Sequence, residues 1–333
     1  MMSSRLDLIV RRLALVAAVA ASILAAPRPA SAQTDRYALV VEGVSGDEEY
    51  AVQHRAWLDG MVSVLKQKLG FDSAHLTVLA EKPGSGEQLS NAANVTAALG
   101  KLAKQLKATD LLFVMLIGHG AGEGADAKFN IVGPDLSVSE WNNLLTPIQG
   151  RLVFVDATSS SFPFVAGLAK PGRVIVTATS KYSQKYHTVF ADGFIKAFSS
   201  DEADADHNGR ISIWEAFAFA SREAAAYYQQ AGHLSTETAV LDDTGKGQGR
   251  DASATSQGST LAGLTYLDAA PSPTSTDPAL QALLDRQRAL SDQIDELRRN
   301  KANMSQADFD AQFEKLATDL ALVTREIQKK RGG

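Results

Sequence analysis

Two apolar stretches of the chain end in polar residues that could perform chemistry. The first, residues 111–117, ends at His119 between two glycines, and the second, residues 152–155, leads to Thr158 and three serines. Each stretch is short, almost entirely apolar and rich in β-branched and aromatic residues, as is typical of a strand buried on both faces of a parallel sheet. Open α/β sheets place their sites at the carboxyl ends of strands, so we expect any chemistry at these two tips.

A histidine and a hydroxyl are the parts of a hydrolase site, in which imidazole is the general base and the hydroxyl attacks a carbonyl. The secondary, β-branched hydroxyl of Thr158 is a poor nucleophile, because threonine nucleophiles rely on their own N-terminal amine and an internal residue has none. Three interpretations stay open. His119 and Thr158 are structural, or a hydrolase uses Thr158, Ser159 or Ser160 with His119, or a pocket remains that binds peptide without cutting it.

The chain contains no cysteine, which excludes disulfides, thiolate metal sites and a cysteine nucleophile. Buried strands and amphipathic helices alternate around the two tips; further strands are expected at residues 37–41, 76–79 and 173–178, and helices at residues 48–69, 95–106, 138–145, 188–199 and 213–230. This order is typical of a parallel sheet, so the predicted fold class is α/β, with a mostly parallel sheet flanked by helices.

The N-terminal segment has the composition of an export signal. Basic residues at 5, 11 and 12 precede an apolar run over residues 13–26, and Ala30, Ser31 and Ala32 form a small-residue cleavage site. We therefore expect residues 1–32 to be a signal peptide and the protein to be periplasmic or secreted. Removal of four arginines and one aspartate takes the formal net charge from −5 to −8, which argues against a nucleic-acid partner. No later segment is apolar enough to span a membrane.

The rest of the chain divides by composition. Residues 33–243 are predicted to form the α/β domain, and residues 244–276, rich in Gly, Ser, Thr and Ala, a flexible linker with one short strand near residues 264–266. In residues 277–331, apolar positions recur at alternating spacings of three and four, with Asp277 and Ser305 at the two helix starts. This pattern predicts a helical hairpin or coiled coil, through which the chain could form a homo-oligomer.

Residues 204–215 fit the twelve-position calcium loop of an EF-hand, with Gly209 at the sharp turn. The ligands at positions one, three, five, seven (a backbone carbonyl), nine (through water) and twelve would come from Asp204, Asp206, Asn208, Arg210, Ser212 and Glu215. The competing interpretation is a plain acidic loop, in which Ser212 and Glu215 form the capping box of the next helix; both can hold at once. A single such loop in an exported protein predicts a structural Ca²⁺ site.

The other histidines lie on predicted helices or loops without the spacing of metal ligands. We expect structural or surface roles for His54, His75, His187 and His233.

The order of these motifs resembles the caspase-like and legumain-like clan of cysteine peptidases. In that clan a His-Gly after one strand supplies the base, and an Asp-Ala-Cys-X-Ser-Gly after the next supplies the nucleophile. The resemblance covers residues 37–243 and implies a caspase-like fold, with His119 and Thr158 at the catalytic positions. The chain departs from the clan's pattern at two positions: Thr158 replaces the cysteine and Ser161 replaces the glycine.

Bacterial relatives of this clan carry a similar calcium loop, followed by a helix and a Thr-Glu-X-Ala-X-Leu-Asp-Asp segment, which residues 236–243 match. The sequence therefore predicts an exported, catalytically inactive caspase-like domain that binds calcium and acts as a binding or scaffolding protein for a protein or peptide partner. The alternative is an active hydrolase that uses Thr158 or an adjacent serine with His119.

Overall fold

The computed structural model of the protein describes residues 35–254, 260–269, 275–301 and 304–331, so the expected signal peptide lies outside the described residues. The strands are β1 Arg36–Glu42, β2 Leu76–Ala80, β3 Gln88–Leu89, β4 Leu111–Ile117, β5 Gly120–Ala121, β6 Lys128–Phe129, β7 Leu136–Ser137, β8 Arg151–Asp156, β9 Arg173–Thr177 and β10 Val240–Asp242. The helices are α2 Glu48–Ser63, α3 Ala92–Gln105, α4 Val138–Leu145, α5 Pro163–Leu168, α6 Phe190–Ala197, α7 Ile213–Gln230, α8 Pro278–Arg299 and α9 Gln306–Arg331. Within the described residues, no helix is long and apolar enough to cross a membrane.

A seven-stranded sheet forms the centre of the α/β domain, in the order β10-β9-β8-β4-β1-β2-β3. All neighbouring strands are parallel except β10, which runs antiparallel to β9. The predicted fold class, a mostly parallel α/β sheet flanked by helices and followed by a C-terminal helical pair, is confirmed. The strands β4 and β8 are parallel neighbours, with Leu116 beside Asp156, so their carboxyl ends lie side by side.

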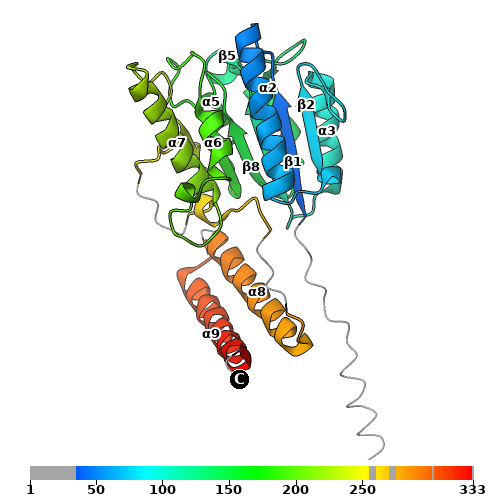
Figure 1. Ribbon diagram of the computed structural model, residues 1–333, viewed down its shortest axis with the longest axis vertical. Coiled ribbons are helices and arrows are strands. Elements are labelled where there is room, and N and C mark those ends of the chain that lie inside the picture. The colour runs from blue at the N-terminus through cyan, green and yellow to red at the C-terminus, as the bar shows by residue number, and fades with distance from the viewer. Residues whose placement is uncertain (1–34, 255–259, 270–274, 302–303, 332–333) are drawn as a thin grey trace, which may run out of the picture. The chain divides into compact units, whose positions relative to one another are not determined.

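The two faces of the sheet bury separate cores, because successive side chains of a strand point to opposite faces. On one face α2, α6 and α7 pack over alternate residues of the central strands, among them Phe113, Met115 and Val155 (Figure 1). On the other face α3, α4 and α5 pack over the intervening residues, including Phe154. Strands covered on both sides carry the continuous apolar runs that the sequence shows.

Helix boundaries follow local capping chemistry. The carboxylate of Asp47 accepts a hydrogen bond from the backbone N–H of Tyr50 and so begins α2. Past Ser63 the helix widens into a π-helical turn over Val64–Lys68, and Gly70, with a φ of 65°, lets the chain leave it. The helix predicted over residues 48–69 is therefore two connected helical segments.

The helices α8 and α9 pack their apolar stripes against each other. Leu284, Leu290, Val323 and Ile327 are buried between them. Asp277 caps the start of α8, and Lys330, near the end of α9, pairs with the same carboxylate. The pair is therefore an antiparallel hairpin.

A residue at the centre of the second core provides a test of the fold. Phe154 is fully buried and contacts the rings of Trp141 and Phe164. We expect Phe154→Ala to lower the free energy of unfolding by about 3–5 kcal/mol, because the truncation leaves a cavity that the sheet cannot close. Urea denaturation measures this as a lower midpoint with an unchanged slope. The exposed Val52→Ala is the matched control and should change the stability by less than about 0.5 kcal/mol.

Candidate functional site

The loops that follow β4 and β8 touch through their backbones. A Cβ atom placed on Gly120 would lie 2.3 Å from the carbonyl oxygen of Ser159 and 3.0 Å from the Thr158 hydroxyl. Only glycine fits there, since real Cβ atoms do not approach backbone so closely. The two predicted catalytic positions, His119 and Thr158, therefore belong to loops in direct contact.

The hydroxyl of Thr158 points into the protein. It is 1% exposed and donates a hydrogen bond of 2.6 Å to Oδ1 of Asp156, which also accepts from the backbone N–H of Thr158. Burial raises the pKa of the Asp156 carboxyl to about 7, although the bonds from Thr158 oppose the rise. A hydroxyl that donates its proton to an internal carboxyl group is not aligned with an external base.

The hydroxyls of Ser159 and Ser161 are bonded within the protein, and Ser160 is held through its backbone. The hydroxyl of Ser159 donates to the carbonyl of Gly120 at 3.3 Å, and the hydroxyl of Ser161 pairs with that of Thr179 at 3.0 Å. Ser160 is buried and holds a φ of 55°, a left-handed conformation that is rare outside glycine. Its N–H bonds the carbonyl of Gln184.

Acyl transfer also needs free N–H groups to stabilise a developing oxyanion. The two N–H groups beside the Thr158 hydroxyl are already bonded within the protein. The N–H of Thr158 donates to Asp156, and the N–H of Gly120 donates to the hydroxyl of Ser159 at 3.3 Å. Neither is free to receive a substrate carbonyl in this conformation.

His119 is bonded away from these hydroxyls. Its Nε2 lies 3.0 Å from the backbone carbonyl of Ser45, in the loop after β1, and its ring meets Tyr50 edge-on at 5.0 Å between centroids. Burial lowers the pKa of His119, and the bond to Ser45 only partly opposes this effect. The neutral ring therefore donates from Nε2 to the carbonyl and keeps its lone pair on Nδ1.

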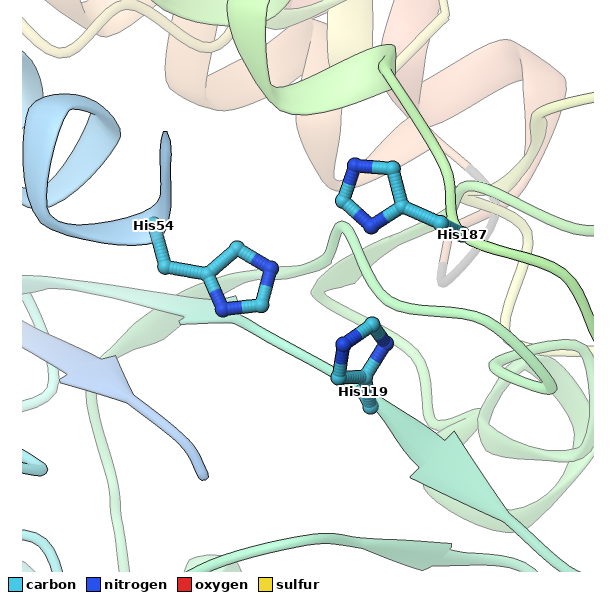
Figure 2. Close-up of side chains that lie close together, drawn as sticks. All are labelled: His54, His119 and His187. Atoms are coloured by element: carbon cyan, nitrogen blue, oxygen red, sulfur yellow. The ribbon is translucent and has the colours of Figure 1, made fainter. Parts of the chain in front are cut away.

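Two histidines that sequence reasoning assigned to structural or surface roles lie beside His119. His54 comes from α2 and His187 from the loop before α6, and Figure 2 shows all three rings gathered in one place. One ring nitrogen of each lies within 4.8 Å of the others. The sequence prediction considered His54 and His187 singly, because no short spacing links residues that the fold brings together. His75 instead stacks on Tyr37.

The loop predicted to bind calcium curls around its own carboxylates. Asp204 accepts hydrogen bonds from the backbone N–H groups of Asn208 and Gly209, and the side-chain oxygen of Asn208 accepts from the N–H of Arg210. His207 and Gly209 have φ values of 55° and 80°, which give the loop its tight turns. Carboxylate oxygens of Asp204, Asp206 and Glu215 lie within 4.8 Å of one another.

Glu215, at the last position of the predicted calcium loop, accepts hydrogen bonds with both carboxylate oxygens. Oε2 of Glu215 accepts from the N–H and hydroxyl of Ser212, which completes a capping box at the start of α7, and Oε1 accepts from the N–H groups of Ala205 and Asp206. The Ser212 hydroxyl is buried and engaged in the cap. The structure thus contains the capping box of the competing interpretation, and the carboxylates of Asp204, Asp206 and Glu215 also lie close together.

A segment far along the chain packs against the calcium-loop candidate. Ser212 forms an isolated antiparallel bridge with Tyr266, and the N–H of Ile213 donates to the carbonyl of Thr265. The guanidinium of Arg210 lies 3.9 Å from the centre of the Tyr266 ring and pairs with Asp268 at 2.8 Å. The Arg210 side chain is therefore directed at this segment. The prediction assigned only its backbone carbonyl to the ion, and so does not need the side chain in the loop.

Comparisons with known proteins give structural likenesses only. No protein-family model matches the chain, and no curated protein matches its sequence. The structure is similar to protein GSU0716 from Geobacter sulfurreducens, at 13% identity and a TM-score of 0.43, over 62% of this chain and 92% of that one. It is also similar to drICE, a caspase, at 13% identity and a TM-score of 0.38, over 59% of this chain and 85% of that one.

The buried Asp156 carboxyl predicts a pH dependence of stability. Its pKa of about 7 in the folded protein is above the ordinary value of 3.8, so the folded state binds more protons than the unfolded state between these values. Stability should therefore be greatest below about pH 4 for this group and fall as the pH rises to about 8. We expect Asp156→Asn, which keeps the acceptor for Thr158 but cannot ionise, to reduce that fall by about 2 kcal/mol or more.

Urea denaturation of both proteins across this pH range measures the difference. Glu237, whose pKa burial also raises to about 7, contributes a fall of the same sign that remains in the variant. Superimposable pH profiles of the wild type and Asp156→Asn would contradict the prediction.

Proposed function

We propose that the chain is an exported, caspase-like protein that has lost peptidase chemistry, binds a structural Ca²⁺ ion and serves to bind a protein or peptide partner. The single observation that carries the loss of chemistry is the hydrogen bond from the Thr158 hydroxyl to Asp156. A nucleophile must present its oxygen to a substrate and its proton to a base. Here the hydroxyl donates its hydrogen bond to a buried carboxyl group two residues away.

Three further contacts support the same proposal. The N–H groups of Thr158 and Gly120 are occupied, and His119 bonds Ser45. The Thr158 hydroxyl is thus not presented to a substrate, the two N–H groups beside it are occupied, and His119 is not directed at it. Each of these parts is needed in a hydrolase of the serine or cysteine type, because they act as one unit.

The calcium proposal is supported by the size of the carboxylate cluster. Ca²⁺ binds oxygen ligands at about 2.3–2.6 Å, so two ligands on opposite sides of the ion are about 4.8 Å apart. The oxygens of Asp204, Asp206 and Glu215 already lie within that span. Each carboxylate oxygen offers two lone pairs, so the N–H bonds that shape the loop leave capacity for an ion.

The segment over residues 264–268 supports a stable, single calcium loop. Paired EF-hands hold their loops together by a short strand contact, and this chain has one candidate loop. The bridge between Ser212 and Tyr266 and the ion pair between Arg210 and Asp268 supply a similar contact from within the chain. These contacts favour a structural role for the ion over a sensor role, because they hold the loop in one conformation against residues 266–268.

The C-terminal hairpin is the part we propose for self-association. Leu280, Leu283, Leu316 and Leu320 remain only partly buried along its seam, and Leu322 is 55% exposed. Apolar residues left over from a two-helix packing are what a second hairpin would cover.

The loss of peptidase chemistry predicts that no cleavage depends on the Thr158 hydroxyl. The purified protein, incubated with a peptide library and analysed by mass spectrometry, should produce no cuts that differ from those of Thr158→Val, which keeps the shape and removes the hydroxyl. Ser159→Ala and Ser160→Ala test the adjacent serines in the same way. Cleavage that disappears in one of these variants and in His119→Ala, but persists in His75→Ala, would establish the alternative hydrolase.

The calcium site predicts a measurable loss when one charge is removed. Glu215→Gln keeps one acceptor oxygen for the capping box at Ser212, but it removes the bidentate carboxylate and the acceptor for the N–H groups of Ala205 and Asp206. We therefore expect Ca²⁺ affinity to fall at least about tenfold in isothermal titration calorimetry. Ca²⁺ should raise the unfolding temperature of the wild type and not of this variant.

The matched control for this experiment is Glu202→Gln, which neutralises an exposed glutamate just before the loop. It should bind Ca²⁺ as the wild type does, because it removes the same charge without removing a ligand. Equal binding by the wild type and Glu215→Gln would contradict the loop assignment, and an absence of binding by the wild type would remove it.

A further inference from the structure

The three histidines beside the former peptidase position come from separate parts of the fold. His54 lies on the inward face of α2, His119 follows the end of β4, and His187 precedes α6 (Figure 2). One ring nitrogen of each lies within 4.8 Å of the others. His54 is fully buried, whereas His119 and His187 are partly exposed.

Four buried nitrogens in this cluster are without hydrogen bonds. Neither Nδ1 nor Nε2 of His54 or of His187 has a partner among the described residues. Buried polar atoms in proteins are almost always paired, because an unpaired group loses its bonds to water and gains none. Four unpaired nitrogens on two neighbouring rings therefore indicate a ligand that the protein side chains do not supply.

Asp47 places a negative charge near the cluster. Its carboxylate interacts electrostatically with all three rings and so favours a cation among them. Neutral imidazole carries the lone pair that binds a metal ion, whereas imidazolium does not.

The surrounding contacts hold each ring in position. The carbonyl of Ser45 fixes the tautomer of His119, as carbonyls do for metal-ligating histidines. Next to His187, the hydroxyl of Thr188 donates to the carbonyl of Ala157 at 2.6 Å, and Glu237 accepts from the N–H groups of Val189 and Phe190. The loop that carries His187 is therefore tied both to the end of β8 and to the segment before β10.

Aromatic rings enclose the cluster. Tyr50 stacks on His187 at 4.4 Å between centroids and meets His119 edge-on. Trp57 lies nearly parallel to His187 and also stacks on His54. These rings restrict the imidazoles and lower the local polarity, which strengthens binding of an ion by neutral nitrogen ligands.

The geometry points to a tri-histidine site for a divalent transition metal ion, formed by His54, His119 and His187. Three imidazoles without thiolate or carboxylate suit Zn²⁺ best among the abundant ions, and also Cu²⁺ and Ni²⁺. Zinc–nitrogen bonds of about 2.0–2.1 Å place tetrahedral ligands about 3.3 Å apart, so ring nitrogens that lie up to 4.8 Å apart would need to close by up to about 1.5 Å.

This site differs in chemistry from the calcium loop and does not rest on the proposed function. The loop at Asp204 offers oxygen ligands, which suit Ca²⁺, whereas the histidine cluster offers nitrogen ligands, which suit Zn²⁺. The site also gives His119 a role that needs no nucleophile at Thr158. An experiment can therefore disprove either metal site without affecting the proposal for the other.

Titration with Co²⁺ tests the site directly. The purified protein, in the Glu215→Gln background so that the acidic loop does not contribute, is freed of metal by chelation and titrated. We expect one Co²⁺ per chain with the intense visible absorption of a tetrahedral nitrogen site, displaced by one equivalent of Zn²⁺. Competition with a chelator then gives the Zn²⁺ affinity.

Single substitutions decide which residues bind the ion. His119→Asn and His187→Asn should each weaken Zn²⁺ binding at least about 100-fold, whereas His75→Ala and His233→Ala, outside the cluster, should not change it. Circular dichroism of each variant checks that it is folded, and His54→Gln serves as a third ligand variant. A featureless cobalt titration of the folded protein, or full binding by folded His119→Asn and His187→Asn, would overturn the assignment.

Discussion

The contact between Gly120 and the backbone of Ser159 is the constraint on which the rest of the site depends. It brings the loop after β4 onto the loop after β8 with no room for a side chain. At this contact the Thr158 hydroxyl is directed inward to Asp156, and the N–H of Gly120 bonds the Ser159 hydroxyl. The same close approach of two backbones therefore lies beside both an internally bonded hydroxyl and an occupied N–H group.

His119 lies at the carboxyl end of β4, beside the Thr158 loop but bonded away from it. A general base needs a pKa near neutrality. Burial lowers the pKa of His119, so the ring is a weak base where it lies. Its position is set by the carbonyl of Ser45 and the ring of Tyr50, which come from the loop after β1 and from α2.

The sequence predicts features formed by residues close together along the chain, but not those formed by residues far apart along it. Continuous apolar runs predict β4 and β8, and the spacing from Asp204 to Glu215 predicts both the carboxylate cluster and the capping box at Ser212. The histidine cluster has no such spacing, because its members lie on three elements. One signal was available: the buried stripe at Leu58, Met61 and Leu65 extends back by one turn to His54, which places this histidine on the inward face of α2.

The two candidate ion sites lie at opposite ends of one helix. His187 comes just before α6, and the loop at Asp204 follows its end and leads into α7. The two helices are packed closely, since a Cβ atom on Gly193 would lie 2.8 Å from the Cα of Ala220. His187 therefore lies just before a helix that packs closely on α7, and the loop at Asp204 connects these two helices. An ion held by Asp204 and Glu215, as proposed, would join this loop to the first turn of α7, at the end of α6 away from His187.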